Sequence, residues 1–416
     1  MVYEDVELSL KNLREAFEVL SREKSEKKNK FLKRLAEKID ENREYLKAEN
    51  SKDVERAREL KVKESLIDRL VLNDKRIDEM IESCQIVESL RDPIGEVVDS
   101  FVREDGLTIY KVRVPIGVLA IIYESRPNVT IETSILALKS GNTILLKGGS
   151  DALNSNKALV KLIKQALDDA DLPRNSVELV EHTDRSVVDY ILKQRGLIDL
   201  IIPRGGKSLI DYVVSNAKMP VLETGAGVCH IFVDESADID KSIAVIDNAK
   251  TQRPGTCNAV ETLLVHRKIA SEFLPKLKKL FDDKKVEIRG CEETRKVIEC
   301  APATEEDWAT EYLDLIISVK VVSSLDEAIE HIKKYSTKHS EAILTENYSN
   351  AMKFLNAIDS STIYVNASTR FTDGGQFGMG AEIGISTQKF HARGPVGLKE
   401  LTTTKFIVFG DYHVRK

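Results

Sequence analysis

The residues best suited to chemistry lie in a turn around one of the five cysteines. Cys257 follows the run Arg253-Pro254-Gly255-Thr256, and the Pro-Gly pair is expected to end a helix and force a turn. Backbone N–H groups that converge at such a turn favour a thiolate, and Arg253 adds a positive charge nearby in sequence. The same N–H groups are suited to hold a developing oxyanion. The turn therefore predicts a reactive cysteine, with an inert loop cysteine as the alternative.

Asn128 lies just after an apolar run that ends at Tyr123. If that run is a strand of an open α/β sheet, Asn128 stands at its carboxyl end, where such sheets place their ligands. Its side-chain amide is a candidate oxyanion donor. The alternative is an Asn that only forms the turn after Pro127.

Two glycine turns follow other apolar runs, at Lys147-Gly148-Gly149 and at Arg204-Gly205-Gly206-Lys207. Glycines after a strand let the backbone approach a phosphate, and the N-terminus of a following helix attracts the anion. Neither turn has the G-x-G-x-x-G spacing of a dinucleotide fingerprint. Each is therefore a candidate phosphate site, with an ordinary strand-to-helix turn as the alternative.

The remaining cysteines and histidines show no spacing typical of a disulfide framework or a zinc site. No metal is expected. Cys229 and His230 fall inside an apolar run, so we expect a packed thiol and a hydrogen-bonded core histidine. Cys84, Cys291 and Cys300 are expected to have no role.

These side chains must be positioned by a chain of two α/β halves. The first ninety residues have helical spacing, with Leu10, Leu13, Phe17 and Leu20 on one face, which predicts a helical layer on the core rather than a coiled coil. Short apolar runs then alternate with helical segments, which predicts parallel sheets buried on both faces. The expected strands are 117–123, 143–146, 177–180, 198–202, 229–233, 262–265, 315–322, 342–344 and 362–365. The expected helices include 156–170, 186–193, 268–280 and 325–334.

Two further strands stand apart from the α/β pattern, at 108–114 and 402–409. Tyr110, Val112 and Val114 alternate with Lys111 and Arg113, as in a strand with one wet face. The two strands are expected to pair with one another. A projecting strand pair has open edges, which favours a homo-oligomer over a monomer.

Composition narrows the class of protein. The 416 residues carry a net charge of −6 and no basic stripe interleaved with aromatics, which argues against nucleic-acid binding. No apolar run approaches the roughly 20 residues that a membrane helix needs. The first residues lack the basic and apolar regions of a signal peptide. We therefore expect a cytoplasmic protein that does not bind membranes.

Four segments, in order along the chain, resemble the gamma-glutamyl phosphate reductases of the aldehyde dehydrogenase superfamily. They are 115–130, Leu222-Glu223-Thr224-Gly225-Ala226-Gly227, Gln252–Cys257, and 377–395 with Phe377-Gly378-Met379-Gly380-Ala381-Glu382. The resemblance implies an aldehyde dehydrogenase-like α/β fold with three parts. These are an NADP-binding Rossmann-like domain (1–100 and 116–225), an α/β catalytic domain with a nucleophilic cysteine (226–395), and a small β oligomerisation hairpin and strand (101–115 and 396–416).

The resemblance also implies roles for individual residues. Cys257 matches the nucleophile, Asn128 the oxyanion asparagine, and Glu223 the general base with which oxidising members activate water. A reductase must keep water from its thioester, so Glu223 is expected only to orient groups. The implied cofactor contacts are Lys147, Arg204, Gly205, Gly206 and Glu311. For Glu311 the match is incomplete, because Glu311-Tyr312-Leu313-Asp314 departs from the superfamily's usual Glu-x-Phe-Gly-Pro motif. The substrate is anionic, so cationic residues in these loops are candidate substrate ligands: Arg126, Arg253, Arg370, His391 and Arg393.

The implied reaction is reduction of L-glutamyl 5-phosphate to L-glutamate 5-semialdehyde and phosphate. It uses NADPH and a cysteine thioester, and is the second step of proline biosynthesis. Glutamate 5-kinase is a candidate partner, because the acyl phosphate is labile. Two rival interpretations are a hydrolytic aldehyde dehydrogenase and a nucleotide-binding protein without catalysis.

Overall fold

The computed structural model describes residues 2–415, except for the side chains of residues 65 and 66. Within this range the chain forms two compact units. Unit 1 consists of the residues up to Thr224, Gly378–Gly384, and the residues from Val396 onward. Unit 2 consists of Gly225–Phe377 and Ile385–Pro395. Each unit is built on its own parallel sheet, so the predicted α/β fold class is confirmed.

The parallel sheet of unit 1 has four strands in the order β5-β4-β3-β6. They are β3 (Val118–Tyr123), β4 (Thr143–Lys147), β5 (Val177–Leu179) and β6 (Leu200–Arg204). Every residue of β3 and β4 is buried, as expected for apolar runs covered on both faces. The predicted strands here are confirmed to within two residues at their starts and ends.

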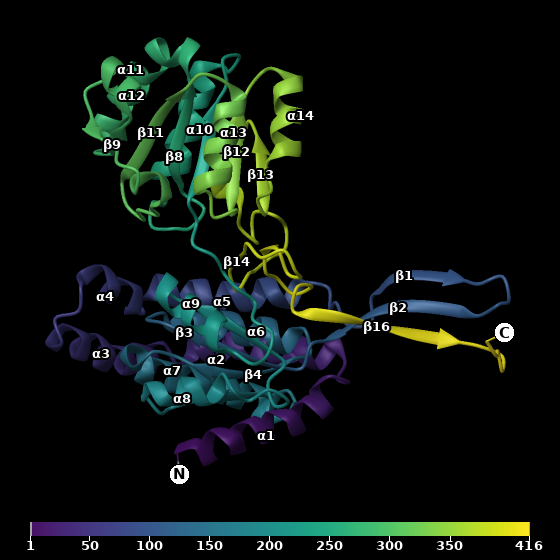
Figure 1. The fold of residues 1–416 in the computed structure, drawn as a ribbon. Helices are drawn as coiled ribbons and strands as arrows, with labels where there is room; N and C mark the ends of the chain where they lie inside the picture. The colour runs from purple at the N-terminus through teal and green to yellow at the C-terminus, as the bar shows by residue number, and fades with distance from the viewer. Residues whose placement is uncertain (1, 416) are drawn as a thin grey trace. The chain divides into compact units, whose positions relative to one another are not determined.

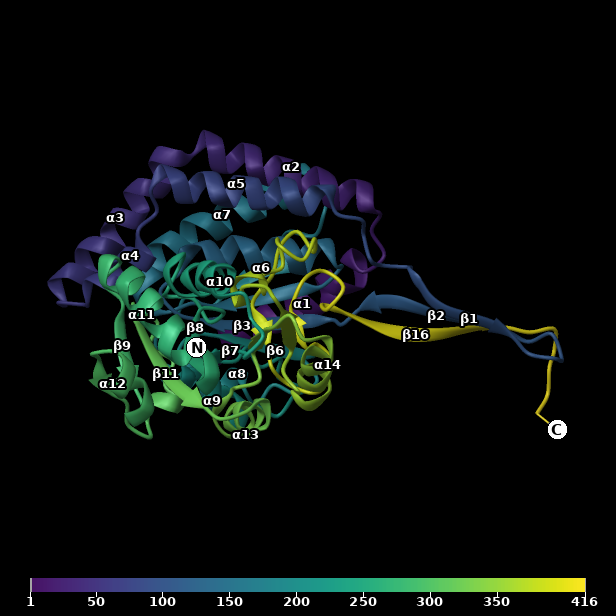
Figure 2. The same cartoon turned by 90° about the horizontal axis from the view of Figure 1, so that it is seen from above.

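Nine α-helices accompany this sheet in the described part of unit 1 (Figure 1). They are α1 (Val2–Leu20), α2 (Ser25–Glu41), α3 (Arg43–Glu59), α4 (Glu64–Leu70), α5 (Asp74–Ser89), α6 (Pro127–Lys139), α7 (Leu153–Asp169), α8 (Arg185–Ile191) and α9 (Lys207–Asn216). Figure 2 shows α2, α5 and α7 running alongside one another. Leu10 and Leu13 of α1 belong to the same buried cluster as Val118 of β3, which confirms the predicted helical layer on the core.

A separate antiparallel sheet in unit 1 has the order β1-β2-β16. Its strands are β1 (Val97–Val102), β2 (Thr108–Pro115) and β16 (Thr402–Phe409), drawn in blue and yellow in Figures 1 and 2. Thr402 pairs with Pro115 and Phe409 with Thr108, so the predicted pairing of the two isolated strands is confirmed. Strand β1 starts earlier than the hairpin predicted from residue 101.

Unit 2 is built on a seven-stranded parallel sheet with the order β10-β9-β11-β8-β7-β12-β13. Its strands are β7 (Cys229–Val233), β8 (Val260–His266), β9 (Glu287–Gly290), β10 (Ala301–Pro302), β11 (Ile316–Val322), β12 (Ser340–Leu344) and β13 (Thr362–Val365). Its helices are α10 (Ile239–Thr251), α11 (Arg267–Asp283), α12 (Glu292–Val297), α13 (Leu325–Tyr335) and α14 (Tyr348–Ala357). Strands β9 and β10 escaped prediction because they are short and carry charged or proline residues.

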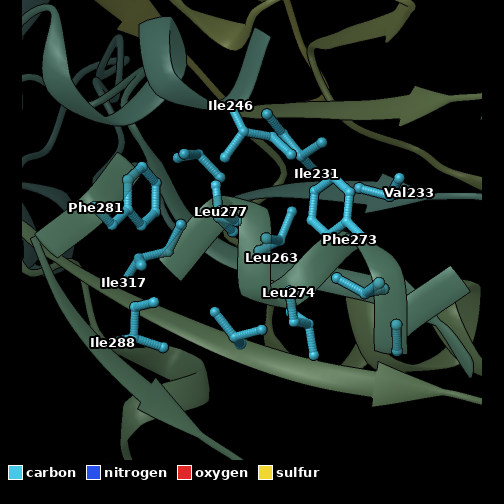
Figure 3. Packing of buried hydrophobic residues seen from close by; sticks show 14 of the residues in the cluster. Ile231, Val233, Ile246, Leu263, Phe273, Leu274, Leu277, Phe281, Ile288 and Ile317 are labelled. Atoms are coloured by element: carbon cyan, nitrogen blue, oxygen red, sulfur yellow. The ribbon is translucent and has the colours of Figure 1, made fainter. Parts of the chain in front are cut away.

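The core of unit 2 lies between α11 and the sheet (Figure 3). Phe273, Leu277 and Phe281 of α11 are fully buried, together with Leu263 of β8 and Ile317 of β11. This packing holds β8 in place, and the turn that carries Cys257 leads directly into β8.

Residues 378–384 pack with unit 1, whereas the resemblance implied a single catalytic domain over 226–395. Gly380 accounts for this packing. A Cβ at this position would lie within about 3 Å of the side chains of Ile86 and Leu90, so the segment is pressed against α5 and the residues just after it. Short strands β14 (Ile385–Ser386) and β15 (Gly394–Pro395) pair antiparallel in unit 2.

No helix within residues 2–415 is long and apolar enough to cross a membrane.

Candidate active site

Cys257 lies in the turn Gln252–Ala259, between the end of α10 and the start of β8. The turn is closed by Ala259, whose N–H donates to the Thr256 carbonyl at 3.0 Å. Cys257 is half-buried, whereas Cys84 and Cys229 are buried. The predicted turn is therefore present, and its thiol is partly open to solvent.

The backbone of Gly227 presses against the Cys257 carbonyl. A Cβ on Gly227 would lie 1.5 Å from that oxygen, so only glycine fits here. The Gly227 N–H donates to Glu311 Oε1 at 2.7 Å. On another side, the Cys229 thiol lies 3.2 Å from the Cys257 carbonyl and donates to it. Burial raises the pKa of Cys229 well above that of a free thiol, so this donor keeps its proton.

Arg370 ties the two ends of the turn together. This residue lies in a short 3₁₀ helix, η4 (Thr369–Phe371). Its Nε donates to Gln252 Oε1 at 2.8 Å, and its Nη1 donates to Thr256 Oγ1 at 3.0 Å and to Asn258 Oδ1. The buried Asn258 amide in turn donates to the Thr372 carbonyl at 2.9 Å. The guanidinium thus holds residues before and after Cys257.

The surroundings of the turn are electropositive. Burial, and after it the neighbouring Arg253 guanidinium, lowers the pKa of Arg370. The side chain of Arg253 is exposed, and its carbonyl accepts the Thr256 hydroxyl at 2.8 Å. Arg370 interacts electrostatically with Cys257, and a positive charge near a thiol favours its thiolate form.

In unit 1, Asn128 is the second residue of α6 and follows β3. It is half-buried, and its Nδ2 donates to Glu132 Oε1 at 2.8 Å, one turn along the same helix. Arg126 is the N-cap residue of α6. Asn128 therefore stands at the carboxyl end of β3, where the sequence predicted it.

The two glycine turns lie at the same edge of this sheet. Ile122 of β3 is in register with Lys147, and Tyr123 is in register with Arg204, so Lys147 and Arg204 close the strands on either side of β3. Lys147 is buried, its Nζ donates to the Gly148 carbonyl at 2.8 Å, and burial lowers its pKa.

The Arg204–Gly206 turn is exposed at its glycines and leads into α9. Gly206 is the N-cap residue, and its N–H donates to Glu124 Oε2 at 2.9 Å. A carboxylate therefore occupies the position at this helix N-terminus that the sequence analysis offered to a phosphate. A phosphate that uses this N–H must displace Glu124.

The remaining predicted site residues are spread over both units. Glu223 is half-buried in unit 1, next to the end of its first segment. His391 is exposed in unit 2. Arg393 donates through Nη1 to Asp359 Oδ1 at 3.0 Å and through Nη2 to the Asp359 carbonyl at 2.8 Å. Unit 2 thus gathers Arg253, Cys257, Glu311 and Arg370 around one turn, whereas Arg393 is engaged with Asp359.

Sequence reasoning missed several contributors to this turn. Gly227 and Asn258 lie inside or beside quoted motifs but received no role. Cys229 was expected only to pack. His230 is buried as expected, and its Nδ1 lies 2.9 Å from the Val228 carbonyl, yet its Nε2 has no hydrogen-bond partner. Glu261 was also overlooked, although a charged residue inside the apolar run of β8 was a usable signal.

Comparison with known proteins places the chain in a family. A sequence profile described as "Aldehyde dehydrogenase family" matches residues 2–298. The gamma-glutamyl phosphate reductase of Thermotoga maritima is 66% identical to this chain over 407 residues, which are 98% of each sequence. The chain belongs to the aldehyde dehydrogenase family. The resemblance noted from its motifs is confirmed.

Other aldehyde dehydrogenase family members extend the comparison. The gamma-glutamyl phosphate reductase of Clostridium acetobutylicum is 53% identical over 98% of this chain and 97% of its own. A crystal structure of gamma-glutamyl phosphate reductase from Thermotoga maritima matches 100% of both chains with a TM-score of 0.97 and 64% identity. An acetylating aldehyde dehydrogenase from Geobacillus thermoglucosidasius shares the fold, with a TM-score of 0.72 at 17% identity over 100% of this chain and 98% of its own.

Proposed function

We propose that this chain is an acyl-phosphate reductase that converts L-glutamyl 5-phosphate into L-glutamate 5-semialdehyde and phosphate, with NADPH as reductant. The reaction is the second step of proline biosynthesis. The observation that carries the proposal is the 66% identity, over 98% of both sequences, to gamma-glutamyl phosphate reductase. The half-buried Cys257 in its electropositive turn supports the chemistry.

In the proposed mechanism the Cys257 thiolate attacks the acyl carbon of the substrate. A sulfur–carbon bond forms, and Asn128 with the backbone N–H groups of the turn stabilises the oxyanion. The carbon–oxygen bond to phosphate then breaks, and phosphate leaves as a stable anion without a strong general acid. The product of this step is a thioester on Cys257.

When bound, NADPH supplies the hydride that reduces the thioester carbon. The oxyanion then collapses, the sulfur–carbon bond breaks, and the aldehyde leaves with Cys257 again a thiolate. None of these reaction steps requires Glu223 to activate a water molecule, and we assign it an orienting role. The cationic residues Arg126, Arg253, Arg370, His391 and Arg393 are the proposed ligands of the substrate carboxylate and phosphate.

The chain's own residues fit a nicotinamide cofactor at one edge of the unit 1 sheet. Lys147, Arg204, Gly205 and Gly206 close neighbouring parallel strands, which is where open α/β sheets bind dinucleotides. Glycines at this turn permit close approach of a phosphate once the Glu124 carboxylate has moved from the Gly206 N–H. In unit 2, Glu311 lies at the cysteine turn and is the proposed ligand of the nicotinamide ribose.

A reverse assay tests the proposed function. Semialdehyde, NADP⁺ and phosphate are mixed with the protein, and each is omitted in turn. We expect NADPH to form only when all three are present. NADPH formation without phosphate would instead identify a hydrolytic aldehyde dehydrogenase.

Two variants test the assigned residues. Cys257→Ala is expected to abolish reduction and leave NADPH binding intact, so retained turnover would refute the nucleophile. Asn128→Ala is expected to lower kcat by roughly 10²–10³-fold, the usual effect of losing one oxyanion donor. An unchanged kcat would remove Asn128 from the oxyanion site.

We also propose that the protein is a cytoplasmic homo-oligomer. The outer strands of the β1-β2-β16 sheet have unpaired edges within unit 1. The sheet also carries apolar side chains that are at least half exposed in unit 1: Val97, Phe101, Val102, Phe406, Val408 and Phe409. Such surfaces favour association with another chain, and a second copy is the proposed partner. Light scattering after gel filtration should give a mass above that of one chain.

Glutamate 5-kinase is proposed as a further, transient partner, and co-purification of the two proteins tests this.

A further inference from the structure

A fully buried charged pair joins the elements on either side of the Cys257 turn. Lys250 is in the last turn of α10, just before the cysteine turn, and Glu261 is the second residue of β8, just after it. Lys250 Nζ lies 2.6 Å from Glu261 Oε2, and both side chains are 0% exposed. The pair therefore joins α10 and β8, the two elements that the cysteine turn connects.

Glu261 also fixes a third segment, residues 311–314. Its Oε1 accepts the Leu313 N–H at 3.2 Å. Leu313 has φ +54°, a left-handed conformation that is unfavourable for a branched residue. The Glu261 carboxylate is the group that holds Leu313 there.

The 311–314 segment lies beside the cysteine turn. The Leu313 carbonyl lies 3.8 Å from where a Cβ of Gly255 would stand. Glu311, two residues earlier, accepts the Gly227 N–H at 2.7 Å, and Gly227 packs on the Cys257 carbonyl. Contacts thus run continuously from the buried pair, through Leu313 and Glu311, to the backbone of Cys257.

A buried ion pair is a weak source of stability, because desolvation of both charges offsets their attraction. Burial raises the pKa of Glu261 and lowers the pKa of Lys250, because desolvation disfavours the charged form of each group. Apolar side chains would fill the same space. Fixing the geometry of the Cys257 turn gives the pair a role that apolar packing does not supply.

We propose that Lys250 and Glu261 are positioning residues, which hold the 311–314 segment against the Gln252–Ala259 turn and so place Cys257 and Glu311. The inference rests on the proposed function of Cys257. Neither residue touches substrate. Their effect is therefore expected in the reactivity of Cys257 and in kcat rather than in KM.

Two double variants test the proposal. K250M/E261L removes the charges and the acceptor for the Leu313 N–H, whereas K250M/E261Q removes the charges and keeps an amide oxygen as acceptor. Since misplacement of a reacting group by about 1 Å costs up to roughly 10²-fold, we expect K250M/E261L to lower kcat by about 10- to 100-fold. KM should change little, and K250M/E261Q should retain more activity.

The matched control is K28M/D92L. Lys28 Nζ and Asp92 Oδ2 form a comparable pair in unit 1, at 3.0 Å with side chains 1% and 9% exposed. Asp92 likewise accepts a backbone N–H, that of Ile94. This variant should lose a similar amount of thermal stability and keep its kcat.

A second readout is the rate at which iodoacetamide alkylates Cys257, followed on its own peptide because Cys291 and Cys300 are also partly exposed. We expect slower alkylation in K250M/E261L than in K28M/D92L. Equal kcat and equal alkylation in these two variants would overturn the positioning role. Should K250M/E261L not fold, the same comparison is made between K250M/E261Q and K28M/D92N. Retained turnover in Cys257→Ala would instead refute the proposed function.

Discussion

Gly227→Ala offers a direct test of the geometry at the cysteine turn. The new Cβ would stand 1.5 Å from the Cys257 carbonyl oxygen, whereas real Cβ contacts below 3.0 Å essentially do not occur. The two backbones must therefore move apart by at least the difference, 3.0 − 1.5 = 1.5 Å. Gly227 has no left-handed φ, so the clash alone, and not backbone strain, drives the movement.

The expected loss follows from that displacement. Moving a reacting group by about 1 Å can cost roughly 10² in rate, so we expect Gly227→Ala to lower kcat by up to about that factor. The Glu311 contact to the Gly227 N–H should weaken too. The assay is steady-state reduction of glutamyl phosphate, or the reverse reaction, together with the alkylation rate of Cys257 and a thermal melt.

Gly255→Ala is the matched control. Gly255 lies in the same turn, but the nearest atom to its new Cβ is the Leu313 carbonyl oxygen at 3.8 Å, an ordinary contact. We expect this variant to melt like the parent and lose far less activity than Gly227→Ala. If Gly227→Ala folds and turns over like Gly255→Ala, the close packing of residue 227 on Cys257 is not needed for catalysis, and the reasoning fails.

Three further predictions concern a guanidinium, a buried imidazole and the core. Arg370→Lys cannot bridge Gln252 and Asn258 at once but keeps the positive charge proposed to bind substrate, so kcat should fall by about tenfold and KM should change less; a rise in KM with an unchanged kcat would refute the bridging role. Burial lowers the pKa of His331 from 6.5 to about 2, so its stabilising contribution is present above pH 6.5 and is lost as the pH falls. Between pH 6.5 and 4.5 the parent should lose about 2.3 kcal/mol more unfolding free energy in urea than His331→Leu, and equal losses would contradict a neutral buried imidazole. Leu277→Ala should cost about 2–5 kcal/mol of unfolding free energy, because Leu277 is 0% exposed in the unit 2 core, and a near-neutral melt would contradict that packing.

Much of this fold was predictable because its strands are buried on both faces. Continuous apolar runs such as Val118–Tyr123, in alternation with helical segments, are typical of such strands, and every strand predicted for the parallel sheets appeared within a few residues. The hairpin was predicted to begin at residue 101, later than β1 begins, because the six exposed residues of β1 show no alternation of apolar and polar residues. The packing of residues 378–384 on α5 is a long-range contact that local sequence does not encode.

The site was predictable in its residue types more than in its contacts. A Pro-Gly turn before Cys257 is a local signal, and so is a glycine pair after a strand. The hydrogen bonds from Arg370 to Gln252 and Asn258 join residues more than a hundred positions apart. The Glu124 carboxylate at the Gly206 N–H likewise comes from another strand end. The three-dimensional arrangement of the strands determines such hydrogen-bond partners, and spacing along the sequence does not predict it.

The pairing of β2 with β16 has a consequence for synthesis of the protein. Pro115 meets Thr402, a separation of 287 positions (402 minus 115). At roughly 5–20 residues per second, a ribosome needs about 15–60 s to make the intervening chain. For that time the hairpin of β1 and β2 has one edge whose native partner does not yet exist. Lys111 and Arg113, in the middle of β2, place charges on that waiting edge, which discourages pairing with a neighbouring nascent chain.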